Sequence, residues 1–225
     1  MAGANVLRVE RAPALIRSQV TDNLRQAILD RRLVPGQRLI ERELVEMTGV
    51  SRTSVREALR ELTAEGLVTA IPNKGTVVAS VSAEEARQLY QVRSALEALA
   101  GRLFVENASD ADRRALNRAF EKVDRTAAKG QPILAAKDAF YDVLFQGGGN
   151  DALKSVVSSL HARVSVLRSL SMSVPGRLAH SVEELQAIVR AVNASDADAT
   201  AAACARHVEQ ACEAGLQALA EQGEG

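Results

Sequence analysis

Two arginines in the first quarter of the chain have the chemistry and the spacing to bind DNA bases. Arg52 and Arg56 are four residues apart, so on a helix they lie side by side on one face. A guanidinium can donate to both O6 and N7 of guanine, which is the commonest base-specific contact in the major groove. Ser51 and Thr53 flank Arg52 with hydroxyl groups. This pattern is typical of the start of a recognition helix.

The residues around these arginines predict two short helices joined by a tight turn. In residues 41–66 the helical pattern breaks at Gly49, which can adopt the positive φ that such a turn requires. Ser51 is placed to cap the second helix. Taken alone, the helix pair is equally well explained as a surface element whose arginines are solvated or paired with Glu57 and Glu61.

A β-hairpin after the helix pair favours the DNA-binding interpretation. Residues 67–71 and 76–79 are short β-favouring runs, and the intervening 72–75 (Pro-Asn-Lys-Gly) has the composition of a turn. Helix, turn, helix and hairpin is the order of a winged helix, in which Lys74 would reach a phosphate or the minor groove. We therefore expect residues 1–80 to form a winged helix-turn-helix domain that binds double-stranded DNA.

The remaining residues, 81–225, are predicted to form an all-α antiparallel helical bundle. Helical patterns cover residues 83–106, 110–129, 133–146, 151–172, 181–193 and 196–221. Start signals include Ser109 with Asp112 and Ser181 with Glu184. No run in this part reads as a strand, so the chain as a whole is expected to be mainly α-helical.

The charge distribution supports a DNA-binding front and a different role for the rear. The formal net charge is zero, but residues 1–80 hold 12 Lys and Arg against 9 Asp and Glu, a net +3, and residues 81–225 hold 16 against 19, a net −3. No apolar run approaches the ~20 residues that a membrane span needs. We therefore expect a cytoplasmic protein without membrane contact.

Several ionisable residues fall on the apolar stripes of the predicted bundle. Arg93 lies between leucines in the first helix, Asp138 lies on the stripe of Tyr141 with Asp142 next to it, and His207 stands among small residues. Buried ionisable groups are costly unless they are paired or functional. These residues therefore indicate either a polar ligand site or a structural ion pair of Arg93 with one of the aspartates.

The first 80 residues resemble the N-terminal domain of the GntR family of bacterial transcription regulators. The similar stretch is VPGQRLIERELVEMTGVSRTSVREALRELTAEGLVTAIPNKGTVV, and it runs without a gap. The resemblance implies that DNA is contacted by Arg42, Arg52, Arg56 and the wing tip Lys74-Gly75, with assistance from Ser51 and Thr53.

The rear of the chain resembles the FCD effector domain of the FadR subfamily, which often holds a metal on one aspartate and three histidines. Asp138 and His207 match two of these ligands, whereas Asp142 and Leu185 stand where two histidines are usual. The resemblance thus implies a degenerate site in which Asp138, Asp142 and His207 hold a divalent zinc or nickel ion weakly, if at all. We expect that no cofactor is required.

These observations predict a homodimeric transcription regulator, a repressor in most such families, that binds a palindromic operator and responds to a small organic carboxylate. Arg93 is the expected carboxylate anchor, because a guanidinium binds a carboxylate through two hydrogen bonds. The expected effector-binding residues are Arg93, Asp138, Tyr141, Asp142 and His207, while His161 and His180 are expected at the surface. No catalytic residue is identified. The alternatives are a metal-dependent, enzyme-like bundle and a purely structural dimerisation bundle.

Overall fold

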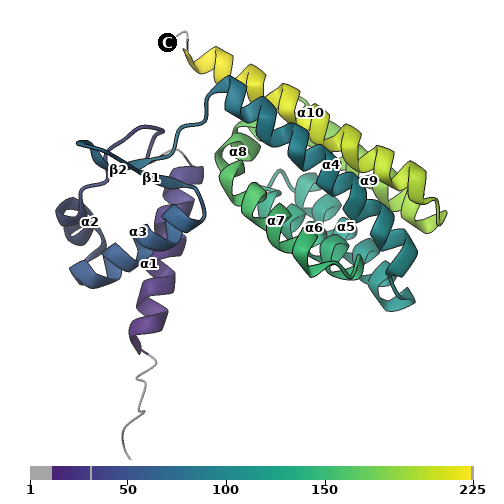
Figure 1. Cartoon of the computed structure of the whole chain (residues 1–225), viewed down its shortest axis with the longest axis horizontal. Coiled ribbons are helices and arrows are strands. Elements are labelled where there is room, and N and C mark those ends of the chain that lie inside the picture. The colour runs from purple at the N-terminus through teal and green to yellow at the C-terminus, as the bar shows by residue number, and fades with distance from the viewer. Residues whose placement is uncertain (1–11, 31, 224–225) are drawn as a thin grey trace, which may run out of the picture. The chain divides into compact units, whose positions relative to one another are not determined.

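The computed structural model describes residues 12–30 and 32–223 (Figure 1). The chain divides between Ser80 and Val81 into two compact units, which we call the head and the body. The expected fold class is confirmed, because a winged helix-turn-helix is followed by a helical bundle. In the described part of the chain, no helix is long and apolar enough to cross a membrane.

The head contains three helices and a two-stranded antiparallel sheet. In chain order these are α1 (Ala12–Leu29), α2 (Glu41–Thr48), α3 (Arg52–Ala64), β1 (Val68–Ile71) and β2 (Gly75–Val78). Arg38 forms a single antiparallel bridge to Val77 of β2, so only this residue stands in the place of a third strand. The hairpin after α3 is the predicted wing.

Local sequence signals explain the turn between α2 and α3. Gly49 has φ +69° and its N–H donates to the carbonyl of Val45, which ends α2 in a left-handed cap. The Ser51 hydroxyl accepts from the N–H of Ser54 and begins α3. The buried face of α3 packs on the head core, so its charged face is left at the surface.

The body consists of seven helices in the described residues. They are α4 (Ala83–Asn107), α5 (Asp110–Ala128), α6 (Leu134–Gly147), α7 (Asp151–Arg163), α8 (Ser165–Ser173), α9 (Arg177–Asn193) and α10 (Ala197–Gly223). The two longest, α4 and α10, run side by side (Figure 1). They approach closely at Gly101, where an added Cβ would lie 2.8 Å from Sγ of Cys204.

The predicted helix over 151–172 is wrong in one respect, because it is two helices that meet at Val164. The two helices bury their apolar side chains in different clusters. Val157 joins the core cluster around Phe140, while Val164 and Leu167 join a second cluster around Tyr90. Packing against two cores therefore overrides the continuous helical pattern.

The predicted start of α9 at Ser181 is also wrong, because the helix begins at Arg177, directly after Gly176 with φ +80°. Ser181 lies inside the helix and is fully buried, where its hydroxyl accepts from Nζ of Lys137. The Ser181 and Glu184 pair resembles a capping box in sequence, but both side chains make tertiary contacts instead.

Candidate DNA interface and candidate effector site

The predicted DNA-contacting residues all lie at the surface of the head. Arg42 on α2, Ser51 at the start of α3, and Arg52, Thr53 and Arg56 on α3 are exposed, as are Lys74 and Gly75 at the wing tip. The turn at Gly49 and the cap at Ser51 position the first turn of α3, which carries most of these groups. This is the arrangement in which a recognition helix presents its N-terminal residues to base edges.

Glu41 at the start of α2 holds both candidate base-reading arginines. Arg56 donates from Nε and Nη2 to the two carboxylate oxygens of Glu41, each at 2.9 Å, and Nε of Arg52 lies 3.8 Å from Oε2. The hydrogen bonds from Arg56 lower the pKa of Glu41. The pairing with Glu57 that the sequence allowed is instead made by Arg60, at 2.7 Å. Glu41 thus binds the Arg56 guanidinium in a bidentate contact. The O6 and N7 atoms of guanine can accept the same pair of hydrogen bonds.

Arg38 is a wing residue that the sequence interpretation missed. Its side chain lies beside the wing tip, since Nε is 3.7 Å from the position that a Cβ on Gly75 would take. Gly75 has φ +82°, which disfavours any other residue at this turn. Arg38 is exposed and has no ion-pair or hydrogen-bond partner for its side chain among the described residues. The backbone bridge between Arg38 and Val77 explains this position, because it places Arg38 beside the wing strand β2.

Replacing Arg38 or Lys74 by alanine is expected to weaken binding to all DNA sequences to a similar extent. Each change removes one cation that neutralises a phosphate, so the slope of log K against log salt should decrease by about 1. Fluorescence anisotropy with a specific and a random duplex over a salt series measures both quantities. Lys122→Ala, which removes an exposed lysine from the body, is the control. A loss confined to one sequence would contradict the phosphate assignment.

The body contains a buried cluster of charged residues, which we call the charged core. Its four buried cations are Arg93, Lys137, Arg168 and Arg177. Nε of Arg93 donates to Oε1 of Glu97 at 2.5 Å, and Nε2 of His161 donates to the same oxygen at 2.7 Å. Arg93 and Glu97 are each 1% exposed. The alternative in which Arg93 forms a structural ion pair with Asp138 or Asp142 is therefore wrong, because its partner is Glu97, four residues along its own helix.

A second group in the charged core joins α9 to α10. Arg177 donates from both terminal nitrogens to the carboxylate of Glu184, at 2.9 and 2.8 Å. Nδ1 of His207 donates to Oε2 of Glu184 at 2.5 Å, so in the neutral ring Nε2 is left as an acceptor. His207 is fully buried, as the sequence predicted.

A third group lies on α6 and its neighbours. Lys137 donates from Nζ to the hydroxyl of Ser181 at 2.8 Å, and Arg168 donates to Asp138 at 2.6 Å. The Arg168 guanidinium lies over the ring of Tyr141, 5.9 Å from its centre. Tyr141 also contacts the rings of both buried histidines. Tyr141 thus connects all three groups of the charged core.

Several buried polar atoms of the charged core have no hydrogen-bond partner among the described residues. They are Nη1 of Arg93, Nε of Arg177, the hydroxyl of Tyr141, Oε2 of Glu97 and Nε2 of His207. An unpartnered buried polar group costs about 1–3 kcal/mol. Because so many unpartnered polar atoms in one cluster destabilise the fold, the cluster indicates a function other than stability.

Burial and the neighbouring charges shift the ionisation of these groups. Burial disfavours the charged form of Glu97, but Arg93 and His161 outweigh it and lower the pKa of Glu97 to about 2. Burial lowers the pKa of His161 to about 4 and the pKa of His207 well below 6.5. Burial, followed by the charges of Arg168, Arg177 and Arg93, lowers the pKa of Lys137 well below 10.5. Both histidines are therefore neutral at pH 7.

The three predicted metal ligands are not brought together. Asp142 is exposed, Asp138 has a side chain that is 52% exposed and paired with Arg168, and Nδ1 of His207 is taken by Glu184. Leu185, at the remaining ligand position, is fully buried in the apolar core. In the described part of the chain, no group of three or more His, Cys, Asp or Glu side chains could hold a metal ion. The residues do not fit the implied metal.

The prediction of Asp138 as a buried ligand on α6 was wrong because the sequence pattern indicated the wrong buried face for this helix. Tyr141 is buried as predicted, but the buried face continues through Lys137 and Phe140 and leaves out Asp138, so the predicted stripe is rotated by about one residue. His161, expected at the surface, is 8% exposed, whereas His180 is exposed. Sequence reasoning also missed the other members of the charged core, which are Glu97, Lys137, Arg168, Arg177, Ser181 and Glu184.

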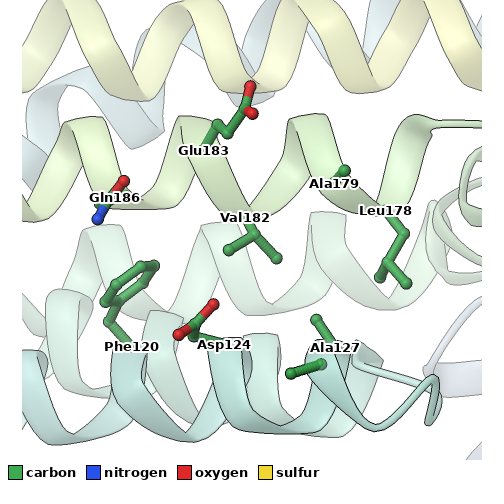
Figure 2. A pocket seen from close by; sticks show the side chains of 9 residues that line it. Phe120, Asp124, Ala127, Leu178, Ala179, Val182, Glu183 and Gln186 are labelled. Carbon is green, nitrogen blue, oxygen red and sulfur yellow. The ribbon is translucent and has the colours of Figure 1, made fainter.

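A surface groove of about 400 Å³ lies between α5 and α9, away from the charged core. Figure 2 shows Phe120 and Ala127 of α5 facing Leu178 and Val182 of α9, with Asp124 between the two α5 side chains. Leu178 and Val182 point toward α5, whereas Arg177, Ser181 and Glu184 on the same helix belong to the charged core. The groove therefore contributes nothing to that core.

Comparisons with known proteins match both parts of the chain. Residues 16–78 match the family described as bacterial regulatory proteins, gntR family, and residues 88–210 match the FCD domain. A probable D-xylose utilization operon transcriptional repressor of Paenarthrobacter nicotinovorans is 31% identical over 196 residues, which cover 86% of this chain and 85% of that protein.

Escherichia coli provides a further relative, and its structure has been solved. The transcriptional regulator McbR is 28% identical over 182 residues, covering 79% of this chain and 82% of McbR. The structure of E. coli McbR/YncC superimposes with a TM-score of 0.72 at 26% identity and covers 87% of this chain and 94% of that one. The chain therefore belongs to the GntR family of bacterial transcription regulators, with a DNA-binding head and an FCD effector-binding domain, and is a regulator rather than an enzyme.

Proposed function

We propose that the protein is a homodimeric, cytoplasmic repressor of the FadR subfamily that binds a palindromic operator and releases it when a small organic acid binds the body. A single head offers too few contacts for specific binding at physiological salt, so two heads must act together. A two-fold dimer fits a palindrome, one half-site for each head. The relative from Paenarthrobacter nicotinovorans is itself described as a repressor, which supports the proposed sign of regulation.

The charged core supports an acid as the effector. Unpartnered donors on Arg93, Arg177 and Tyr141 are buried in one cluster, and a carboxylate is the group that accepts from such donors. Nε2 of His207 has an unused lone pair, so the effector should also carry a hydroxyl or an amine that donates to it. This set of complementary unpartnered atoms is the observation that carries the proposal.

A screen of small acids tests the effector assignment. Each acid is compared with its amide, which has the same shape without the charge, for thermal stabilisation of the protein and for release of bound DNA. A true effector should do both, because a ligand that binds one state preferentially shifts the equilibrium toward it. A body that is purely structural would respond to none of the acids.

The exposed apolar side chains of the body support a dimer surface on α4 and α7. Val92 and Leu99, one heptad apart on α4, are 51% and 41% exposed, and Val156 on α7 is 51% exposed. The two helices are in contact, so these side chains belong to neighbouring faces. Exposed large apolar residues on neighbouring elements are typical of an interaction surface. We propose that a second copy of the body covers them.

Replacing both Val92 and Leu99 by aspartate is expected to convert the dimer into monomers and to weaken binding to a palindromic operator. The new carboxylates would lose their hydration in the interface, and they would repel their copies across a two-fold axis. Sedimentation of the purified variant measures the oligomeric state. Arg190→Asp, at an exposed position of α9, is the control and should remain dimeric. An unchanged dimer in the double variant would rule out this surface.

Arg52→Ala is expected to weaken binding to the operator by about 1–3 kcal/mol and to relax base preference at one position in each half-site. The operator is obtained by selecting duplexes from a random pool with the wild-type protein. Binding of single-base variants of that duplex then gives the preference at each position. Arg60→Ala is the matched control, because Arg60 is an exposed arginine of the same helix that pairs with Glu57. Equal loss on operator and random DNA would exclude base recognition by Arg52.

A further inference from the structure

The charges of the charged core leave one cation without a counter-ion. Three of its buried cations each pair with a carboxylate; these pairs are Arg93 with Glu97, Arg168 with Asp138 and Arg177 with Glu184. Lys137 is 4% exposed, and among the described residues its only hydrogen-bond partner is the neutral hydroxyl of Ser181, at 2.8 Å. A buried amine in this position is unfavourable unless an anion comes to it.

We propose that Lys137 and Ser181 form the carboxylate-binding position of the body, and that the Lys137 amine, not a metal ion, supplies the positive charge that a bound acid meets there. This inference rests on the proposed function, since it assigns which residues bind the acid. The amine on α6 and the hydroxyl on α9 can both donate to a carboxylate oxygen. The binding position is thereby built from two helices, held together by the contact between Nζ and Oγ.

The surroundings of Lys137 favour an anion and disfavour a metal cation. Arg93, Arg168 and Arg177 face it from α4, α8 and α9, and Glu184 is the carboxylate that acts on it. The guanidinium groups keep their charge at every relevant pH, so a metal ion placed here would be repelled. Nε of Arg177 is buried without a partner and is available to the second carboxylate oxygen. The charge of the acid would then be shared between an amine and a guanidinium.

The test measures thermal unfolding of the full chain with sodium acetate, against sodium chloride at equal ionic strength and against acetamide. Wild-type protein is expected to show an acetate-dependent rise in Tm that acetamide does not produce. Lys137→Met should lose this rise, as should the milder Lys137→Gln, and both should have a Tm in the absence of acetate no lower than that of the wild type. Lys122→Met, at an exposed position of α5, should retain it.

The outcomes separate this inference from the proposed function. If Lys137→Met and Lys137→Gln keep the acetate response while Arg93→Met loses it, the acid binds in the charged core but not on Lys137. If wild-type protein shows no response to acetate, the inference is wrong, whereas the acid-binding function is decided by the separate screen of small acids, which includes acids that also carry a hydroxyl or an amine. A chelator should leave the wild-type response unchanged, and loss of the response on chelation would show that a metal ion, not Lys137, provides the charge.

Discussion

Arg93→Met is expected to lower the free energy of unfolding of the body by about 3–5 kcal/mol, because it leaves the carboxylate of Glu97 buried without its guanidinium partner. Both residues are 1% exposed, so water cannot replace the lost contact. The change also removes the cation that lies over the ring of Tyr90. The neutral His161 would remain as the single hydrogen-bond donor to Glu97. Denaturant unfolding of the full chain measures the loss.

Arg168→Met is the matched control for this experiment. Arg168 is also buried, but the side chain of its partner Asp138 is 52% exposed, so water can solvate the carboxylate after the guanidinium is removed. Its cost is therefore expected to be much smaller. In the double variant Arg93→Met, Glu97→Leu, both charges are absent, and much of the lost stability should return. Equal losses for Arg93→Met and Arg168→Met would mean that the burial of Glu97 is not the cause.

The body is expected to lose stability as the pH falls from about 6.5 to about 4, because His161 is held neutral in the folded state. Burial lowers the pKa of His161 from 6.5 to about 4, so between these values the unfolded chain binds a proton that the folded chain does not. Stability therefore rises with pH through this window, and about 3 kcal/mol is lost on acidification. Glu97, whose pKa is lowered to about 2, adds a further loss in the same direction below pH 4.5.

Denaturant unfolding over a pH series tests this prediction. His161→Gln should show a shallower pH dependence between pH 6.5 and 4, because the titrating group is absent. Part of the slope should remain, since burial also lowers the pKa of His207. His180→Gln, which removes an exposed histidine, should keep the wild-type profile. If His161→Gln and wild type have the same pH dependence, His161 is not the group that titrates.

The head was predictable from the sequence because its signals are local. Gly49 ends α2 and Ser51 begins α3 within three residues of each other, and the wing turn at 72–75 lies between two short β-favouring runs. Each signal acts through the backbone of its own neighbourhood, so no distant partner has to be known. The exposed arginines of α3 follow from the same local pattern, since the buried stripe fixes which face remains at the surface. The role of Arg38 needed the fold, because its proximity to the wing is a tertiary contact.

The charged core was not predictable, because its members come from helices far apart in sequence. Lys137 meets Ser181 across 44 residues and His161 meets Glu97 across 64. In the sequence alone, Ser181 and Glu184 fit a helix cap, and no residue near Lys137 marks it as buried. The sequence determined that the rear half is helical and that Arg93 and His207 lie on buried faces. The tertiary structure decided which cations have counter-ions, because the cost of burying a charge depends on partners that only packing brings together.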